Sequence, residues 1–169
     1  MILHRLRAAN ALKYTLLDLS DLPEQGVILL TGPNESGKST IGELICLALF
    51  GRTHALPELS VERAIRWGER ELEIEVEVTA SDENRWRICR RLNLEGDRSA
   101  SMFCAAKDVE IRGWRAVNQA IERLLGYDFD AFIESFYLAR REIAPPHPRS
   151  ETLKAMAGVD IVRTIYKGN

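Results

Sequence analysis

The chain has 169 residues, of which 46% are hydrophobic and 28% charged, and its formal net charge is −2. This composition is ordinary for a globular domain with a core, and it provides no overall positive field that would attract nucleic acid. Three widely spaced cysteines favour neither a metal site nor a disulfide framework, and no apolar run approaches the ~18 residues of a membrane span. We therefore expect a cytoplasmic protein with no membrane partner.

The first part of the chain predicts strands that lead into a helix. Residues 2–10 and 14–19 are both expected to form strands, and the apolar run 26–31 predicts a third strand that ends directly before Gly32. The mostly apolar segment after Ser39 predicts a helix that Gly51 ends.

Between the third strand and this helix lies a phosphate-binding sequence. The pattern G-x-x-x-x-G-K-[ST] is matched without a substitution by Gly32, Pro33, Asn34, Glu35, Ser36, Gly37, Lys38 and Ser39. Two glycines allow a tight backbone whose N–H groups surround phosphate oxygens, and the helix N-terminus points at the same anion. Lys38 is expected to contact the β- and γ-phosphates, Ser39 to bind Mg²⁺, and Thr40 to make a further contact. The sequence therefore predicts a site for ATP with Mg²⁺.

Residues 71–92 alternate with a period of two and predict a hairpin that turns at Asp82. Opposite charges on one face and apolar side chains on the other select the same register. The expected pairs are Glu77–Arg87, Glu73–Arg91, Val78–Trp86, Val76–Ile88 and Leu72–Leu92. Arginines opposite glutamates indicate a solvated, charge-matched face rather than a DNA contact. Arg90 interrupts the apolar row and is expected at a margin of the sheet.

The remaining elements are simpler. A short helix is expected at 57–67, a further β segment at 101–106 and a helix at 116–125 that ends at Gly126. Asp128 is expected to cap a helix with a buried aromatic stripe, and the proline-rich residues 145–148 mark a boundary before a last helix. The three tryptophans, Trp67, Trp86 and Trp114, are interpreted as packing residues rather than base stackers, and a position of one of them near the adenine stays open.

Parts of a complete triphosphatase are missing from the sequence. We find neither an apolar strand that ends in an acidic residue, which would hold the Mg²⁺ water shell, nor a Leu-Ser-Gly-Gly signature. The chain is therefore expected to bind nucleotide as half of a catalytic unit, and to have little or no ATPase activity by itself.

The arrangement resembles the N-terminal lobe of SMC-like ABC-type ATPases, in particular the SbcC-type subunit of double-strand-break repair. The similar stretches are the opening strand that ends at Asn10, the Gly-Pro-Asn start of the phosphate sequence, residues 43–51, and residues 124–138. The resemblance implies an α/β P-loop NTPase fold, of the ABC-head type, with an added antiparallel sheet and the start of a coiled-coil arm. It implies an ATP-binding lobe at 1–144, and at 145–169 a linker and helix that lead towards the coil.

The resemblance also implies partners. These are a C-terminal ATPase lobe of the same protein, a second head in an ATP-bound homodimer, DNA, and a nuclease subunit. One position departs from the family pattern, because Arg140 stands where the family has a glutamine that contacts Mg²⁺ and water. An arginine cannot bind Mg²⁺, although it could contact a phosphate.

Two other functional classes remain open on the sequence. One is a non-catalytic nucleotide-binding scaffold module, which the missing acidic motif and Arg140 favour. The other is a small-molecule P-loop kinase, which such a length would suit, although kinases usually place the phosphate sequence near the N-terminus and follow it with helices. Little β-structure would favour the kinase.

Overall fold

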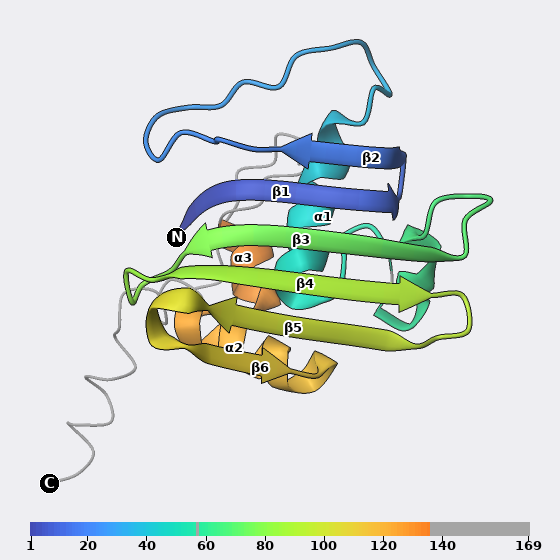
Figure 1. Ribbon diagram of the computed structural model, residues 1–169. Coiled ribbons are helices and arrows are strands. Elements are labelled where there is room, and N and C mark those ends of the chain that lie inside the picture. Colours follow the sequence, from blue (N-terminus) through green and yellow to red (C-terminus); the bar gives the residue numbers. More distant parts are fainter. Residues whose placement is uncertain (57, 136–169) are drawn as a thin grey trace, which may run out of the picture. The chain divides into compact units, whose positions relative to one another are not determined.

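The computed structural model describes residues 1–56 and 58–135, and its main feature is one antiparallel sheet (Figure 1). The six strands run in the order β2-β1-β3-β4-β5-β6. Their bounds are β1 Ile2–Ala11, β2 Tyr14–Leu19, β3 Glu71–Thr79, β4 Arg85–Asn93, β5 Arg98–Cys104 and β6 Val109–Arg112. The predicted strands at 2–10 and 14–19 are confirmed, and β3 inserts beside β1 although more than fifty residues of chain separate β2 from β3.

The hairpin β3–β4 has the predicted register. All five expected pairs are formed, including Glu73 opposite Arg91 and Val76 opposite Ile88. The turn after β3 is stabilised by Asp82, whose carboxylate accepts hydrogen bonds from the Asn84 backbone, the Trp86 indole and Lys107. Partial burial raises the pKa of Asp82, but these hydrogen bonds outweigh burial and lower the pKa to about 2.

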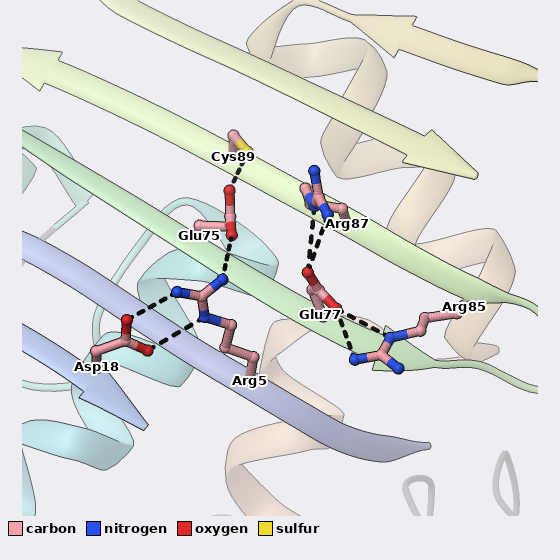
Figure 2. Close-up of polar contacts among 7 residues, drawn as sticks. All are labelled: Arg5, Asp18, Glu75, Glu77, Arg85, Arg87 and Cys89. Carbon is pink, nitrogen blue, oxygen red and sulfur yellow. Dashed lines mark hydrogen bonds and ion pairs between the residues drawn. The ribbon is translucent and has the colours of Figure 1, made fainter. Parts of the chain in front are cut away.

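The outer face of the sheet carries a network of opposite charges (Figure 2). The Arg5 guanidinium lies between Asp18 of β2 and Glu75 of β3, at 2.7 and 3.8 Å. Glu77 accepts from two arginines of β4, Arg85 at 2.7 Å and Arg87 at 3.2 Å. The arginines of β4 on this face are therefore paired with carboxylates, as the sequence predicts, and they do not present a free basic surface.

The inner face of the sheet forms the core. Helices α1 (Lys38–Phe50) and α2 (Trp114–Leu125) both pack on this face, α1 against β1, β3 and β4, and α2 against β5 and β6 (Figure 1). Both helices end where a glycine adopts the left-handed conformation, Gly51 and Gly126, as predicted. The buried side chains from the sheet, the helices and the segment between α1 and β3 include Leu6, Leu44, Leu47, Val61, Ile74, Val76, Ile88, Leu92, Met102, Val117 and Ile121.

Two expectations for smaller elements are corrected, and one strand was not expected. The helix expected at 57–67 is a shorter 3-10 segment, Glu58–Ala64, with a non-helical kink at Ser60. The β segment expected at 101–106 lies at Arg98–Cys104, and β6 was missed because its four residues are too few to give a clear alternation.

A second unit begins at Tyr127. Its described part contains α3 (Phe129–Ser135), and the Asp128 carboxylate accepts a hydrogen bond from the Ala131 N–H at 2.9 Å, which confirms the predicted cap. Phe129 and Phe132 are buried, as expected. Arg140, residues 145–148 and the expected last helix lie outside the described residues. Among the residues that the structure describes, no helix is long and apolar enough to cross a membrane.

Candidate functional site

The predicted phosphate-binding residues form an exposed loop that leads directly into α1. We call residues 32–40 the phosphate loop. Its backbone has positive φ values at Gly32, Glu35 and Gly37, which are 153°, 64° and 100°. A turn of this kind directs successive N–H groups towards its concave side, and the first N–H groups of α1 have no partner within the helix. The loop and the helix start can therefore donate several hydrogen bonds to one anion.

The Lys38 side chain lies against the inside of this loop. Its Nζ donates to the carbonyl oxygens of Gly32 at 2.8 Å and Pro33 at 2.6 Å. The loop carbonyls thus hold the Lys38 ammonium group close to the start of α1. This places a fixed positive charge where an oxyanion would be surrounded by donors.

Two residues support the phosphate loop, Lys13 of the β1–β2 connection and Tyr14 at the start of β2. Lys13 Nζ donates to the Glu35 carbonyl at 2.6 Å, and the Tyr14 hydroxyl donates to the Gly37 carbonyl at 3.2 Å. A Cβ atom at Gly37 would lie 2.8 Å from that hydroxyl, so close approach as well as backbone conformation requires glycine there. Sequence reasoning missed both supports, because no motif relates a turn after Asn10 to a loop that begins twenty residues later.

The residues present fit ATP with Mg²⁺. Residues 32–36 and Ser39 are exposed, and the loop carries one ammonium group and several backbone donors. Nowhere in residues 1–56 and 58–135 do three or more His, Cys, Asp or Glu side chains gather in a group that could hold a metal ion. Mg²⁺ is typically bound through one or two protein oxygens, phosphates and waters, so a single Ser39 hydroxyl beside a phosphate is consistent with its chemistry.

The strand expected at 26–31 is not formed. The segment has no ladder partner among the described strands, and Val27, Ile28, Leu29 and Leu30 are exposed by 95, 50, 80 and 41%. An apolar run becomes a strand only when a neighbouring strand takes its N–H and C=O groups, and no strand in the described part of the chain lies beside it. The run is as apolar as a strand, but the described residues contain no neighbouring strand to pair with it.

The far end of α1 is held by a buried arginine. Arg90 of β4 is completely buried, not at a margin of the sheet as expected, and it donates to the carbonyls of Ala48 at 2.7 Å and Leu49 at 2.6 Å. Its guanidinium lies 4.7 Å from the ring centre of Trp114, and a Cβ at Gly51 would approach that ring to 2.6 Å. Burial lowers the pKa of Arg90 to about 9, so it remains charged at neutral pH and complements the negative end of the helix dipole.

The three tryptophans differ. Trp86 is buried and Trp114 packs against Arg90, so both are packing residues as expected. Trp67 is 98% exposed, so its interpretation as a packing residue is wrong. It follows the 3-10 segment on a loop where no apolar side chain covers it.

Together the sheet, the phosphate loop and the helix that follows it define a P-loop NTPase fold of the type found in SMC heads. A family model described as "AAA domain" matches residues 6–156, and the chain belongs to that family.

Curated relatives are DNA double-strand-break repair ATPases and part of a nuclease. The chain is 29% identical over 149 residues to the DNA double-strand break repair Rad50 ATPase of Methanocaldococcus jannaschii. This alignment covers 85% of the chain and 14% of that protein. It is 32% identical over 130 residues to the Rad50 ATPase of Methanopyrus kandleri, with 71% of the chain and 14% of that protein covered. The SbcC component of the nuclease SbcCD from Deinococcus radiodurans is 29% identical over 170 residues, or 94% of the chain and 18% of that protein. The chain thus spans less than a fifth of each relative, and the resemblance to the SbcC-type family is confirmed.

Solved structures show the same fold. The chain matches a structure from work on ATP-driven dimerization and DNA-stimulated activation of SMC ATPases, with a TM-score of 0.61, 15% identity, and 92% of this chain and 99% of that chain covered. It also matches the recombination mediator protein RecF bound to ATP, with a TM-score of 0.54, 19% identity, and 67% and 28% covered. At these identities the likeness establishes the fold, which confirms the predicted class.

Proposed function

We propose that this chain is the ATP-binding N-terminal half of an SMC-like ATPase that acts in DNA repair or chromosome maintenance. The observation that carries the proposal is the geometry at Lys38, whose ammonium group is held against the loop carbonyls beside the start of α1. In the proposal, the phosphate loop holds the triphosphate, Lys38 neutralises its β- and γ-oxygens, and the Ser39 hydroxyl binds Mg²⁺. Asn34 and Thr40, which belong to the same loop, would make further contacts with the nucleotide.

We further propose that the catalytic unit needs a C-terminal lobe of the same protein and a second head. The exposed run Val27–Leu30 supports this, because four consecutive uncovered apolar residues next to the nucleotide loop suit a strand that another lobe completes. The sequence also contains no acidic motif that would complete a Mg²⁺ site for hydrolysis. Residues 1–144 would form the lobe, and residues 145–169 would lead towards a coiled coil.

DNA and a nuclease subunit are proposed partners, by relation to proteins named for double-strand-break repair and for the SbcCD nuclease. Within the described residues, the arginines of β4 that face outward are paired with glutamates, so the outer face of β3 and β4 is a poor candidate for the DNA surface. A small-molecule kinase is disfavoured, because the helix after the phosphate loop packs on one face of a six-stranded antiparallel sheet, whereas such kinases usually follow this loop with helices and a lid. The scaffold alternative predicts binding without turnover even when the second lobe is present.

The proposal is tested by calorimetry of ATP binding with and without Mg²⁺. We expect the 169-residue chain to bind Mg·ATP, Lys38→Ala to abolish binding, and Ser39→Ala to weaken binding with Mg²⁺ more than without it. Lys107→Ala, which removes an ammonium group that contacts Asp82 away from the loop, is the matched control and should bind normally.

Hydrolysis is tested separately. The chain alone should show no steady turnover, and addition of the C-terminal lobe should restore it. Unchanged ATP affinity in Lys38→Ala would refute the nucleotide site. Binding without turnover in the presence of both lobes would favour the scaffold.

A further inference from the structure

A large hollow lies beside the phosphate loop. Its volume is about 1150 Å³, and it is bounded by the start of α1 with Ser39 and Thr40, by Leu12 and Lys13 of the β1–β2 connection, and by the segment 62–70. The nucleoside attached to a triphosphate on the phosphate loop could therefore extend directly into this hollow. The hollow is large enough for a nucleoside, since small-molecule sites typically measure about 300–1,000 Å³.

Trp67 stands at this hollow on a fixed backbone. The Glu69 N–H donates to the Arg66 carbonyl at 3.0 Å, and Gly68 has φ +90°, so residues 66–69 form a tight turn. That turn is attached to the end of β1, because the Arg66 N–H donates to the Asn10 carbonyl at 2.8 Å. The backbone is thus held while the indole, 98% exposed, keeps its faces open to the hollow that Ser39 and Thr40 share.

The surroundings of Trp67 suit an anionic ligand with a flat apolar part. Leu12 and Ile65 supply apolar surface in the same lining. Arg63, Arg66 and Arg70 also line the hollow, and among the described residues their side chains form no ion pair. Unpaired arginines raise the local positive potential and attract polyphosphates.

We propose that Trp67 stacks on the base of the nucleotide whose triphosphate is held by the phosphate loop, and so makes the site prefer a nucleoside triphosphate over the polyphosphate alone. This inference rests on the proposed function, since it assigns the base of the same ligand. Stacking on an aromatic side chain is available to every base, because each has a π face, so Trp67 supplies affinity for a base rather than a choice among bases.

A single-stranded nucleic acid is the competing occupant, and the lining argues against it. Three carboxylates, Glu43, Glu62 and Glu69, interrupt the basic lining, so the hollow is not a continuous positive groove of the kind that follows a nucleic-acid backbone. A mononucleotide avoids them, because its phosphates lie on the loop and only its base and ribose reach the hollow.

The experiment compares Mg·ATP with magnesium tripolyphosphate, which has the phosphates without the base. Binding of both ligands is measured by calorimetry for the wild-type chain and for Trp67→Ala, Trp67→Phe and Phe103→Ala. The last variant is the matched control, because Phe103 is a partly exposed aromatic on the outer face of β5. Far-UV circular dichroism checks the fold of each variant, and an indole without buried contacts should be removable without unfolding.

We expect Trp67→Ala to weaken ATP binding about tenfold, Trp67→Phe to retain most of the affinity, and tripolyphosphate binding to be unchanged in every variant. ATP, and not tripolyphosphate, should also quench tryptophan emission, and the quench should vanish in Trp67→Phe. Equal ATP affinity in Trp67→Ala and wild type would overturn the inference while leaving the nucleotide site intact. A loss confined to the binding of a thymidine oligonucleotide would overturn it in favour of nucleic acid. Failure of the wild-type chain to bind either ATP or tripolyphosphate would refute the proposed function itself.

Discussion

Arg90 gives the sharpest test of how the phosphate-loop helix is held. Its two hydrogen bonds to the Ala48 and Leu49 carbonyls involve a charged donor, and such bonds contribute about 1.5–3 kcal/mol each. Truncation to alanine removes both, leaves two buried carbonyls without their donor and opens a cavity beside Trp114. Removal of a buried charge that has no acidic partner offsets part of this loss. We expect Arg90→Ala to lower the free energy of unfolding by about 3–5 kcal/mol.

The assay is urea unfolding of the chain, followed by circular dichroism. Arg91→Ala is the matched control, because Arg91 is the next residue on the same strand but points outward, and its side chain is 65% exposed in an ion pair with an exposed Glu73. Such a pair contributes at most about 1 kcal/mol. Arg90→Met, which keeps apolar volume, should lose about 1–3 kcal/mol, since packing is retained and the charge is removed. If Arg90→Ala and Arg91→Ala shift the urea midpoint equally, the reasoning about the buried guanidinium is wrong.

Three further predictions follow from individual residues. Gly37→Ala should weaken ATP binding at least about tenfold, because the new Cβ would meet the Tyr14 hydroxyl and the backbone is left-handed there. Gly96→Ala is the control, because Gly96 has φ +90° and open space, so this substitution introduces the backbone strain alone. The Asp82 carboxylate should stabilise the fold above about pH 4, because its pKa is lower in the folded than in the unfolded chain. This stabilisation should be lost as the pH falls towards 2, so the urea midpoint should fall less over that range in Asp82→Asn than in the wild type. A thiol reagent at pH 8 should modify Cys89 slowly, because burial and then Glu75 raise its pKa to about 11, and Glu75→Gln should speed the reaction; an unchanged rate would argue against that charge effect.

The hairpin could be predicted in detail because two independent patterns select one register. Shifting β4 by one residue against β3 would place Arg87 and Arg91 opposite apolar side chains, so the charges and the core exclude the alternative together. The phosphate loop could be predicted because its spacing encodes a local backbone shape, and local shape depends on neighbouring residues rather than on distant ones.

Two of the predictions that failed depend on distant groups. The run 26–31 has the hydrophobicity of a strand, but strand formation needs a partner that sequence periodicity does not reveal. Arg90 was placed at a margin because a cation in an apolar row is costly, and the α1 carbonyls that satisfy it lie about forty residues earlier. Trp67 was interpreted as a packing residue on residue type alone, whereas the turn at 66–69 presents it to solvent.

The bond between Arg90 and the end of α1 also bears on the order in which the newly made chain acquires its structure. At about 5–20 residues per second, a ribosome adds residue 90 about 2 to 8 s after residue 48. In that interval α1 is a helix of 13 residues with its last carbonyls unsatisfied, a length at which helices on their own are only marginally formed in water. The nucleotide-binding element of this lobe should therefore become persistent only when the second strand of the hairpin has been synthesised, and a nascent chain halted before residue 90 should not yet retain ATP.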